Sequence, residues 1–239
     1  MPIRAVWTEV NLGYLENNIT NIKSCINNNA KWCAVVKADA YGHGALAVAR
    51  KCVELGASYL AVAAISEAIA LRKSGFTTPI LILGPTPIEA AGTVVDYDIT
   101  QAVFTMEQAK AISKAAIVRD KTAKLHLKID TGFGRYGFCY LEKEKMVESI
   151  KKLSNIKITG TFSHLSLAFY EKDDHSKKQF DRFIDCIEVL KENGIETGML
   201  HICNSSGFFK YKEMRLNAVR VGSAFTGRLS IPNIYGLKK

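Results

Sequence analysis

The stretch AVVKADAYGHGA, residues 34–45, bears on both the fold and the chemistry of this chain. Its apolar, β-rich start runs into Lys37 and then into a polar loop with two glycines. An open doubly wound sheet that binds a dinucleotide carries G-x-G-x-x-G at its first strand-to-helix turn, and KADAYGHG does not match that pattern. The stretch therefore favours a different α/β fold. Lys37 itself is either the point where a strand reaches water or a functional amine.

Strand and helix patterns alternate along the whole sequence. Short β-rich runs occur at 32–37, 59–64, 79–84, 99–104, 124–130, 157–164, 199–204 and 216–222. Helical patterns lie at 45–56, 66–75, 105–116, 141–154 and 176–194, and a further helix is expected at about 12–26. Ser66 and Thr105 are expected N-caps, and Gly56 is an expected C-cap. Eight such units in 239 residues predict a (β/α)8 TIM barrel over residues 1–239, with an open doubly wound sheet as the competing fold.

The charge pattern argues against a nucleic-acid-binding protein. The chain has 32 basic and 23 acidic residues and a net charge of +9. Its lysines are scattered along the predicted helices, which is typical of solvated helix faces. No basic tract is interleaved with aromatic residues, so we expect no nucleic-acid partner.

Cysteine usage and hydropathy point to a reducing compartment. Six cysteines occur, and none forms a C-x-x-C pair, so we expect neither a disulfide framework nor a metal site. The first residues lack the long apolar segment of a secretory signal, and no apolar stretch approaches the length of a membrane span. We therefore expect a cytoplasmic protein with no membrane partner.

Polar residues gather at the predicted carboxyl ends of the strands, where barrel active sites lie. They are Lys37, Asp39, Tyr41 and His43 after the first strand, Asp130 and Arg135 after the fifth, His164 after the sixth, Asn204, Ser205 and Ser206 after the seventh, and Arg220, Gly222 and Ser223 at the eighth. A closed barrel would bring all of them to one rim.

The chemistry of these residues is coherent. Period-two alternation puts Lys37 on the same side of its strand as Cys33 and Val35. If that side faces inward, apolar surroundings and nearby cations lower the pKa of the amine and favour a nucleophile that forms a Schiff base with an aldehyde. Small residues after the seventh and eighth strands are suited to a phosphate. Pyridoxal phosphate satisfies both requirements, and so does a sugar phosphate in an aldolase-like enzyme.

Five segments, in order, resemble the bacterial alanine racemases, which are fold-type III pyridoxal-phosphate enzymes. They are AVVKADAYGHGA, HLKIDTGFGRYGF, TFSHL, HICNSSG and VRVGSAFTG, the last with Val221 where the family usually has proline. The resemblance spans essentially the whole chain. It implies pyridoxal 5'-phosphate as cofactor and the interconversion of L- and D-alanine, or of a similar small amino-acid substrate such as serine.

The resemblance also implies roles for individual residues. Lys37 would form the Schiff base with the cofactor and act as one of two acid/base groups, and Tyr41 would contact the phosphate. Arg220 would donate to the pyridine nitrogen, with His164 supporting it. Arg135 would reach the phenolic oxygen of the cofactor and the substrate carboxylate.

Further residues are implied around the phosphate and beside Arg135. Asn204, Ser205, Gly222 and Ser223 would hold or back the phosphate. Lys128 matches a lysine that is carbamylated in some members of the family, where the new carboxylate orients the neighbouring arginine.

The residue type at position 220 also indicates the type of reaction, independently of the resemblance. An arginine stays protonated and acts only as a donor, so a ring nitrogen that accepts from it stays unprotonated and the cofactor becomes a weaker electron sink. Racemisation is favoured by this arrangement. Related decarboxylases have a carboxylate at this place. Arg220 therefore argues against a further hypothesis, that the chain is a decarboxylase barrel.

The second base of the family is a tyrosine of a C-terminal β-domain, which reaches the active site of the other subunit in a homodimer. None of Tyr136, Tyr140, Tyr170, Tyr211 and Tyr235 lies in the motif for that base. We therefore expect a barrel part of a longer, dimeric racemase, impaired when isolated. The alternative is a barrel-only protein that binds or buffers pyridoxal phosphate with little turnover.

Overall fold

A computed structural model describes residues 6–26, 30–229 and 236–238, so Tyr235 lies outside the described residues. The strands are β1 (Lys31–Val35), β2 (Tyr59–Val62), β3 (Ile80–Ile82), β4 (Thr100–Val103), β5 (Ala123–Asp130), β6 (Phe138–Cys139), β7 (Ile156–Phe162), β8 (Met199–His201) and β9 (Ala218–Val221). All paired neighbours run parallel, in the order β8-β7-β5-β4-β3-β2-β1-β9, and the two-residue β6 adds to β5.

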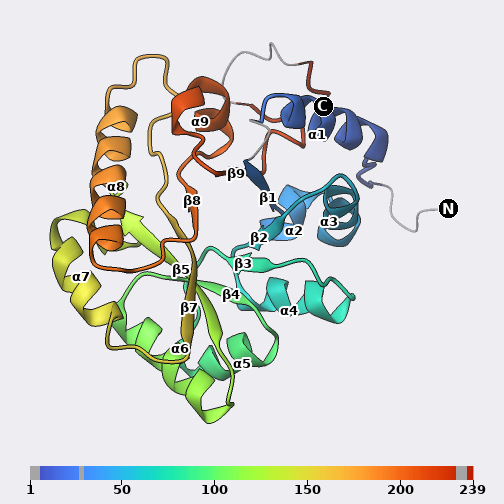
Figure 1. The fold of residues 1–239 in the computed structure, drawn as a ribbon. Coiled ribbons are helices and arrows are strands. Elements are labelled where there is room, and N and C mark those ends of the chain that lie inside the picture. Colours follow the sequence, from blue (N-terminus) through green and yellow to red (C-terminus); the bar gives the residue numbers. More distant parts are fainter. Residues whose placement is uncertain (1–5, 27–29, 230–235, 239) are drawn as a thin grey trace.

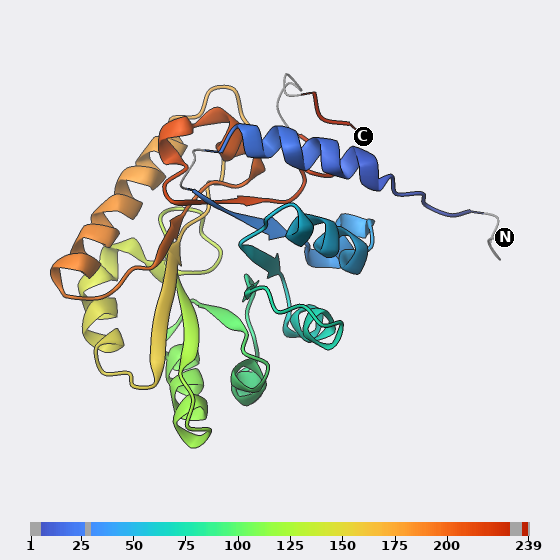
Figure 2. The same cartoon turned by 45° about the vertical axis from the view of Figure 1, so that its right-hand side comes forward.

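The helices lie outside the strands, as Figures 1 and 2 show. They are α1 (Leu12–Ser24), α2 (Lys37–Gly42), α3 (Ala45–Glu54), α4 (Ile65–Lys73), α5 (Ala91–Asp96), α6 (Met106–Val118), α7 (Lys143–Ile150), α8 (His175–Glu192) and α9 (Ser205–Lys210). Short 3-10 turns are η1 (Ile88–Ala90), η2 (Tyr140–Glu142) and η3 (Lys212–Met214). No described helix is long and apolar enough to cross a lipid bilayer.

The eight longer strands form a nearly closed barrel, which confirms the predicted fold and excludes the open doubly wound sheet. Strands β8 and β9 meet at the seam without forming a ladder. The seam is bridged by a backbone hydrogen bond from Arg220 N to the carbonyl of Cys203 (3.3 Å) and by one from Leu200 N to the Asn217 side chain (2.7 Å).

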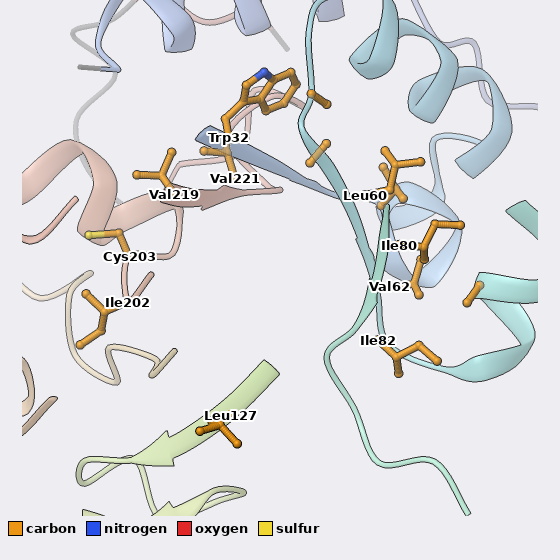
Figure 3. Close-up of a cluster of buried hydrophobic side chains, with 14 of the residues drawn as sticks. Trp32, Leu60, Val62, Ile80, Ile82, Leu127, Ile202, Cys203, Val219 and Val221 are labelled. Carbon is orange, nitrogen blue, oxygen red and sulfur yellow. The ribbon is translucent and has the colours of Figure 1, made fainter. Parts of the chain in front are cut away.

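Two apolar layers follow from the period-two alternation of the strands. Outward-facing side chains of adjacent strands, among them Trp32, Leu60, Ile80 and Val219, are buried between the strands and the helices (Figure 3). The smaller inner cluster contains Cys33, Val35, Ala61, Leu81, Ala102, Phe104 and Phe162. Cys33 and Val35 therefore face the barrel interior, as the alternation requires for an inward Lys37.

Several element boundaries differ from the sequence-based expectation. Strand β1 ends at Val35, so Lys37 follows the strand as the first residue of α2. Helix α4 begins after Ala64, so the expected N-cap Ser66 is wrong. Thr105 is confirmed as the N-cap of α6, because its hydroxyl accepts from Gln108 N (3.3 Å). Gly56 follows α3 with φ +89°, which is the left-handed backbone that ends many helices.

Candidate active site

A cavity of about 230 Å³ lies at the carboxyl ends of β1, β7, β8 and β9. Its lining includes eight of the expected site residues, namely Lys37, Tyr41, His164, Asn204, Ser205, Arg220, Gly222 and Ser223. A second cavity, of about 280 Å³, shares Lys37, His164 and Arg220 and adds Lys128 and Arg135. Barrel closure thus brings the ten residues that were assigned a role at the site into two adjoining cavities. Asp39, His43 and Asp130 were also expected at this rim, but they line neither cavity.

The turn after Lys37 has an uncommon backbone. Ala38, Asp39, Ala40 and Tyr41 all have left-handed dihedral angles, with φ between +50° and +57°. For residues with a Cβ, each such conformation costs about 1–2 kcal/mol, so the surroundings must stabilise the turn. Asp39 Oδ1 accepts from Ala45 N (2.6 Å), and Glu67 Oε1 accepts from Ala38 N (2.6 Å). The turn carries Lys37 and Tyr41 into the same cavity.

Lys37 is partly buried among cations. Its pKa is lowered, first by burial and then by Arg135, while Glu67 raises it and Arg220 lowers it further. These directions agree with the expectation of an amine that gives up its proton more readily than an ordinary lysine. Burial also raises the pKa of the neighbouring Tyr41 hydroxyl to about 12, so Tyr41 is a neutral donor at pH 7.

Arg220 is buried at 3% exposure and has no acidic partner among the described residues. Its guanidinium donates instead to three backbone carbonyls, those of Ser163 (2.9 Å), His201 (3.2 Å) and Ile202 (3.2 Å). Burial lowers its pKa to about 10, which still leaves it protonated at pH 7. The side chain is thus a fixed, permanently charged donor at the floor of the cavity.

His164 faces two donors. Its Nδ1 lies 3.1 Å from Arg220 Nη2, and its Nε2 lies 3.4 Å from Asn204 Nδ2. A protonated imidazole would find no acceptor at either nitrogen, and burial together with Arg220 lowers its pKa well below the ordinary value. His164 is therefore neutral beside Arg220.

A chain of histidines continues from Arg220 into the barrel. Arg220 Nη1 donates to His201 Nδ1 (2.6 Å), so neutral His201 carries its proton on Nε2 and donates to His126 Nδ1 (3.1 Å). His126 Nε2 has no partner among the described residues. Gly160 stands opposite His126 in the ladder, and a Cβ there would overlap the imidazole ring. Burial lowers the pKa of His126 to about 3 and lowers that of His201 well below its ordinary value, so both histidines are uncharged.

Lys128 and Arg135 add positive charge at the second cavity. Lys128 is buried, and within the described residues its Nζ donates only to its neighbour's carbonyl, Ile129 O (3.2 Å). Burial and then Arg220 lower its pKa to about 7. Arg135 is exposed and lies over the Phe133 ring at 4.3 Å. Asp130 faces this loop but accepts from three loop N–H groups, at 2.8–3.2 Å, so it shapes the loop.

Gly222 is required where it stands. A Cβ at this position would overlap the Tyr41 hydroxyl group, so only glycine allows the β9 backbone to approach Tyr41 this closely. Gly222 N donates to Ser205 Oγ (3.3 Å). Asn204 caps α9 by accepting from Gly207 N (2.9 Å). These contacts form a small polar corner of the first cavity, bounded by hydroxyl and backbone N–H groups.

Both the sequence and the structure of this chain are similar to those of known proteins. The sequence pattern of the family "Alanine racemase, N-terminal domain" matches residues 10–230. The chain belongs to this family. An alanine racemase of Clostridium tetani is 42% identical over 228 residues, and "Alanine racemase 2" of Caldanaerobacter subterraneus subsp. tengcongensis is 39% identical over 226 residues. Each alignment covers 94% of this chain and 58% of the relative.

Solved racemase structures have the same fold. An alanine racemase of Clostridium difficile 630 in complex with cycloserine superimposes with a TM-score of 0.94 at 35% identity, over 99% of this chain and 65% of that one. An alanine racemase of Bacillus anthracis with bound L-Ala-P gives a TM-score of 0.88 at 33% identity, over 98% and 60%. The family expectation is confirmed. The chain spans about 60% of the length of the curated relatives it matches.

Sequence reasoning missed three features of the site. His126 and His201, which form the buried chain below Arg220, were not among the expected site residues, although His126 lies two positions before Lys128 and so shares its inward face. Glu67 and the left-handed turn were also unforeseen. No local pattern signals either one, because Glu67 reaches the turn from another strand–helix unit.

Proposed function

We propose that this chain is the cofactor-binding barrel of a pyridoxal-phosphate-dependent racemase, acting on alanine or a similar small amino acid such as serine, with residues 1–239 as one domain. Family membership supports this proposal. The observation that carries it is the convergence of Lys37, Tyr41 and Arg220 on one cavity, rich in positive charge and without an acidic lining residue.

The residues present fit pyridoxal phosphate. Arg220 and Lys128 are buried cations without a carboxylate partner among the described residues, and an anionic ligand would balance their charge. At the other end of the cavity, Tyr41, Ser205 and the glycine backbone at Gly222 provide donors and close approach for a phosphate. Lys37 lines both cavities, together with Arg220 and His164.

The bound cofactor would supply an aldehyde that condenses with amines and a conjugated ring that spreads negative charge from the α-carbon of an amino acid. Lys37 would provide the amine, because its lowered pKa increases the fraction in the neutral, nucleophilic form. The same nitrogen can hold or release a proton at the α-carbon on one face of the substrate.

Arg220 would donate a hydrogen bond to the ring nitrogen without transferring its proton. Its three carbonyl partners hold the guanidinium plane, and neutral His164 lies beside it. An arginine cannot give up its proton at neutral pH, so this residue limits how much charge the ring withdraws. That property supports racemisation over decarboxylation.

Lys128 is proposed to be carbamylated. Its pKa of about 7 leaves a substantial neutral fraction, and a neutral amine adds to CO2 with loss of one proton to form a carbamate. The resulting anion would stand among the cations of the second cavity, where no described lining residue is acidic, and would orient Arg135.

Racemisation also needs a proton-transfer group on the opposite face of the substrate. We propose that a tyrosine of a further domain supplies it from the partner in a homodimer, as in the family that the chain resembles. A barrel that binds the cofactor with little turnover is the alternative, and the two are separated by measuring racemisation with and without that domain.

Borohydride trapping tests the cofactor site. The chain is incubated with pyridoxal phosphate, reduced, digested and analysed by mass spectrometry. We expect the label on Lys37 and its loss in Lys37→Ala, with Lys31 at the other end of β1 remaining unlabelled. A label on a different lysine, retained in Lys37→Ala, would show that the site lies elsewhere.

A further inference from the structure

Glu67 connects two strand–helix units at the edge of the candidate site. It is the third residue of α4, and its Oε2 accepts from Ala63 N (2.7 Å) and Ala64 N (3.0 Å) at the start of that helix. Its other oxygen, Oε1, accepts from Ala38 N (2.6 Å), the residue directly after Lys37. One carboxylate therefore holds the backbone at the ends of both β1 and β2.

An internal comparison shows that the start of α4 does not by itself require a charged side chain. In α6 the residue at the same helical position is Gln108, and its Oε1 accepts from Phe104 N (3.2 Å) just before that helix. A neutral amide thus performs the corresponding task in the unit after β4. The second oxygen of Glu67 has no counterpart there, since an amide offers one acceptor atom and a carboxylate offers two.

We propose that Glu67 is a positioning residue for Lys37, which secures the left-handed turn after β1 and thereby sets where the Lys37 amine stands. This inference rests on the proposed function, in which Lys37 is the amine that binds the cofactor. The turn needs such support because four consecutive left-handed residues are unfavourable. Ala38 is exposed as a residue, and its N–H group donates to the Glu67 carboxylate.

The charge of Glu67 acts on the same amine. The groups that act on Lys37 are Arg135 from the loop after β5, Arg220 from β9 and Glu67 from α4, with neutral His164 and Tyr41 in the same cavity. Burial and both arginines lower the pKa of Lys37, and Glu67 alone among these groups raises it. Removing this carboxylate should therefore lower the pKa of Lys37 further.

The test compares Glu67→Gln with Gln108→Ala in the chain without cofactor. Lys37 is titrated by trace acetylation at a series of pH values, with its peptide quantified by mass spectrometry. Pyridoxal phosphate affinity is measured separately by absorbance. In Glu67→Gln we expect the midpoint of Lys37 acetylation to move to lower pH and cofactor affinity to fall by about tenfold, since one hydrogen bond to a charged acceptor is lost. Gln108→Ala should lower the unfolding temperature but leave both quantities unchanged.

Two further measurements separate positioning from general stability. Glu67→Asp keeps the charge but shortens the reach, so the acetylation midpoint should recover while cofactor affinity stays low. In the unmodified chain the Ala38 amide proton should exchange slowly although the residue is exposed, and this measurement needs no variant to fold.

The inference is overturned if Glu67→Gln changes only the unfolding temperature, or if the Ala38 amide exchanges as fast as one in a free loop. Failure of the proposed function is recognised separately, because the unmodified chain would then not be labelled at Lys37 by pyridoxal phosphate. Lys37 acetylation and Ala38 amide exchange would still test the hydrogen bond between Ala38 and Glu67 in that case.

Discussion

Arg220 is buried inside the barrel, and in the described part of the chain its guanidinium bonds to backbone carbonyls and has no acidic partner. These carbonyls lie at or just after the carboxyl ends of β7 and β8, so a single guanidinium on β9 can bond to several of them. This arrangement leaves the positive charge without a compensating carboxylate among the residues that the structure describes. An anionic ligand is therefore favoured in the cavity above it.

Gly222 offers a prediction at the residue scale. A valine there would displace Tyr41 and keep a bound phosphate away from the backbone N–H groups in the polar corner of the first cavity. Gly222→Val should weaken binding of pyridoxal phosphate by about tenfold or more, since charge-assisted hydrogen bonds are lost, and should weaken phosphate-free pyridoxal much less. Both ligands are titrated by absorbance. Equal weakening of the two would mean that the phosphate binds elsewhere.

At the scale of the element, the left-handed turn after β1 is the least regular part of the site. Its shape brings Lys37 and Tyr41, four positions apart, to one cavity. A right-handed turn would also close over four residues, but it would point the following chain in another direction. The hydrogen bonds to Asp39 and Glu67 offset part of the strain.

Strain in this turn is measurable through glycine. Ala38 is exposed with φ +50°, and glycine adopts that conformation without a Cβ clash. Ala38→Gly should therefore raise the free energy of unfolding by about 0.5–1 kcal/mol. The matched control is Ala47→Gly, an exposed position inside α3, which should lower it by about 1 kcal/mol. Denaturant unfolding of both variants gives the values, and destabilisation by Ala38→Gly would contradict the left-handed assignment.

On the scale of the whole molecule, barrel closure determines which residues meet. Lys37 follows β1 and Arg220 lies on β9, yet these strands are neighbours because the sheet curves round to its seam. His164 and Asn204 arrive from β7 and β8 on the other side of that seam.

The one-sided placement of Lys37 predicts an imbalance in catalysis by the 239-residue chain. With cofactor and alanine in deuterium oxide, the α-hydrogen of one enantiomer should exchange much faster than the enantiomers interconvert. A missing general acid/base group typically slows a reaction by about 10²–10⁴-fold, and only inversion requires the second group. Exchange is followed by NMR and inversion by chiral chromatography. If both rates are equal and fast, a side chain of the barrel itself supplies the second proton.

Local patterns in the sequence were sufficient for the architecture and for most of the residues expected to line the candidate site. Strand and helix periodicity depends on neighbours a few positions apart, so eight alternating units could be read directly and the barrel followed. Residues at strand ends, from Lys37 to Ser223, were identified because barrel function concentrates there. The boundaries were less accurate: β1 ends before Lys37, and α4 begins before Ser66.

Tertiary structure alone decided how those residues are held. The carbonyls around Arg220, the histidine chain from His201 to His126 and the bond from Ala38 to Glu67 all join segments that are distant in sequence. Their geometry depends on strand register and on closure of the seam, which no local pattern encodes. The sequence by itself determined the set of chemical groups at the rim, and the closed barrel determined their distances, their charge balance and which of them share a cavity.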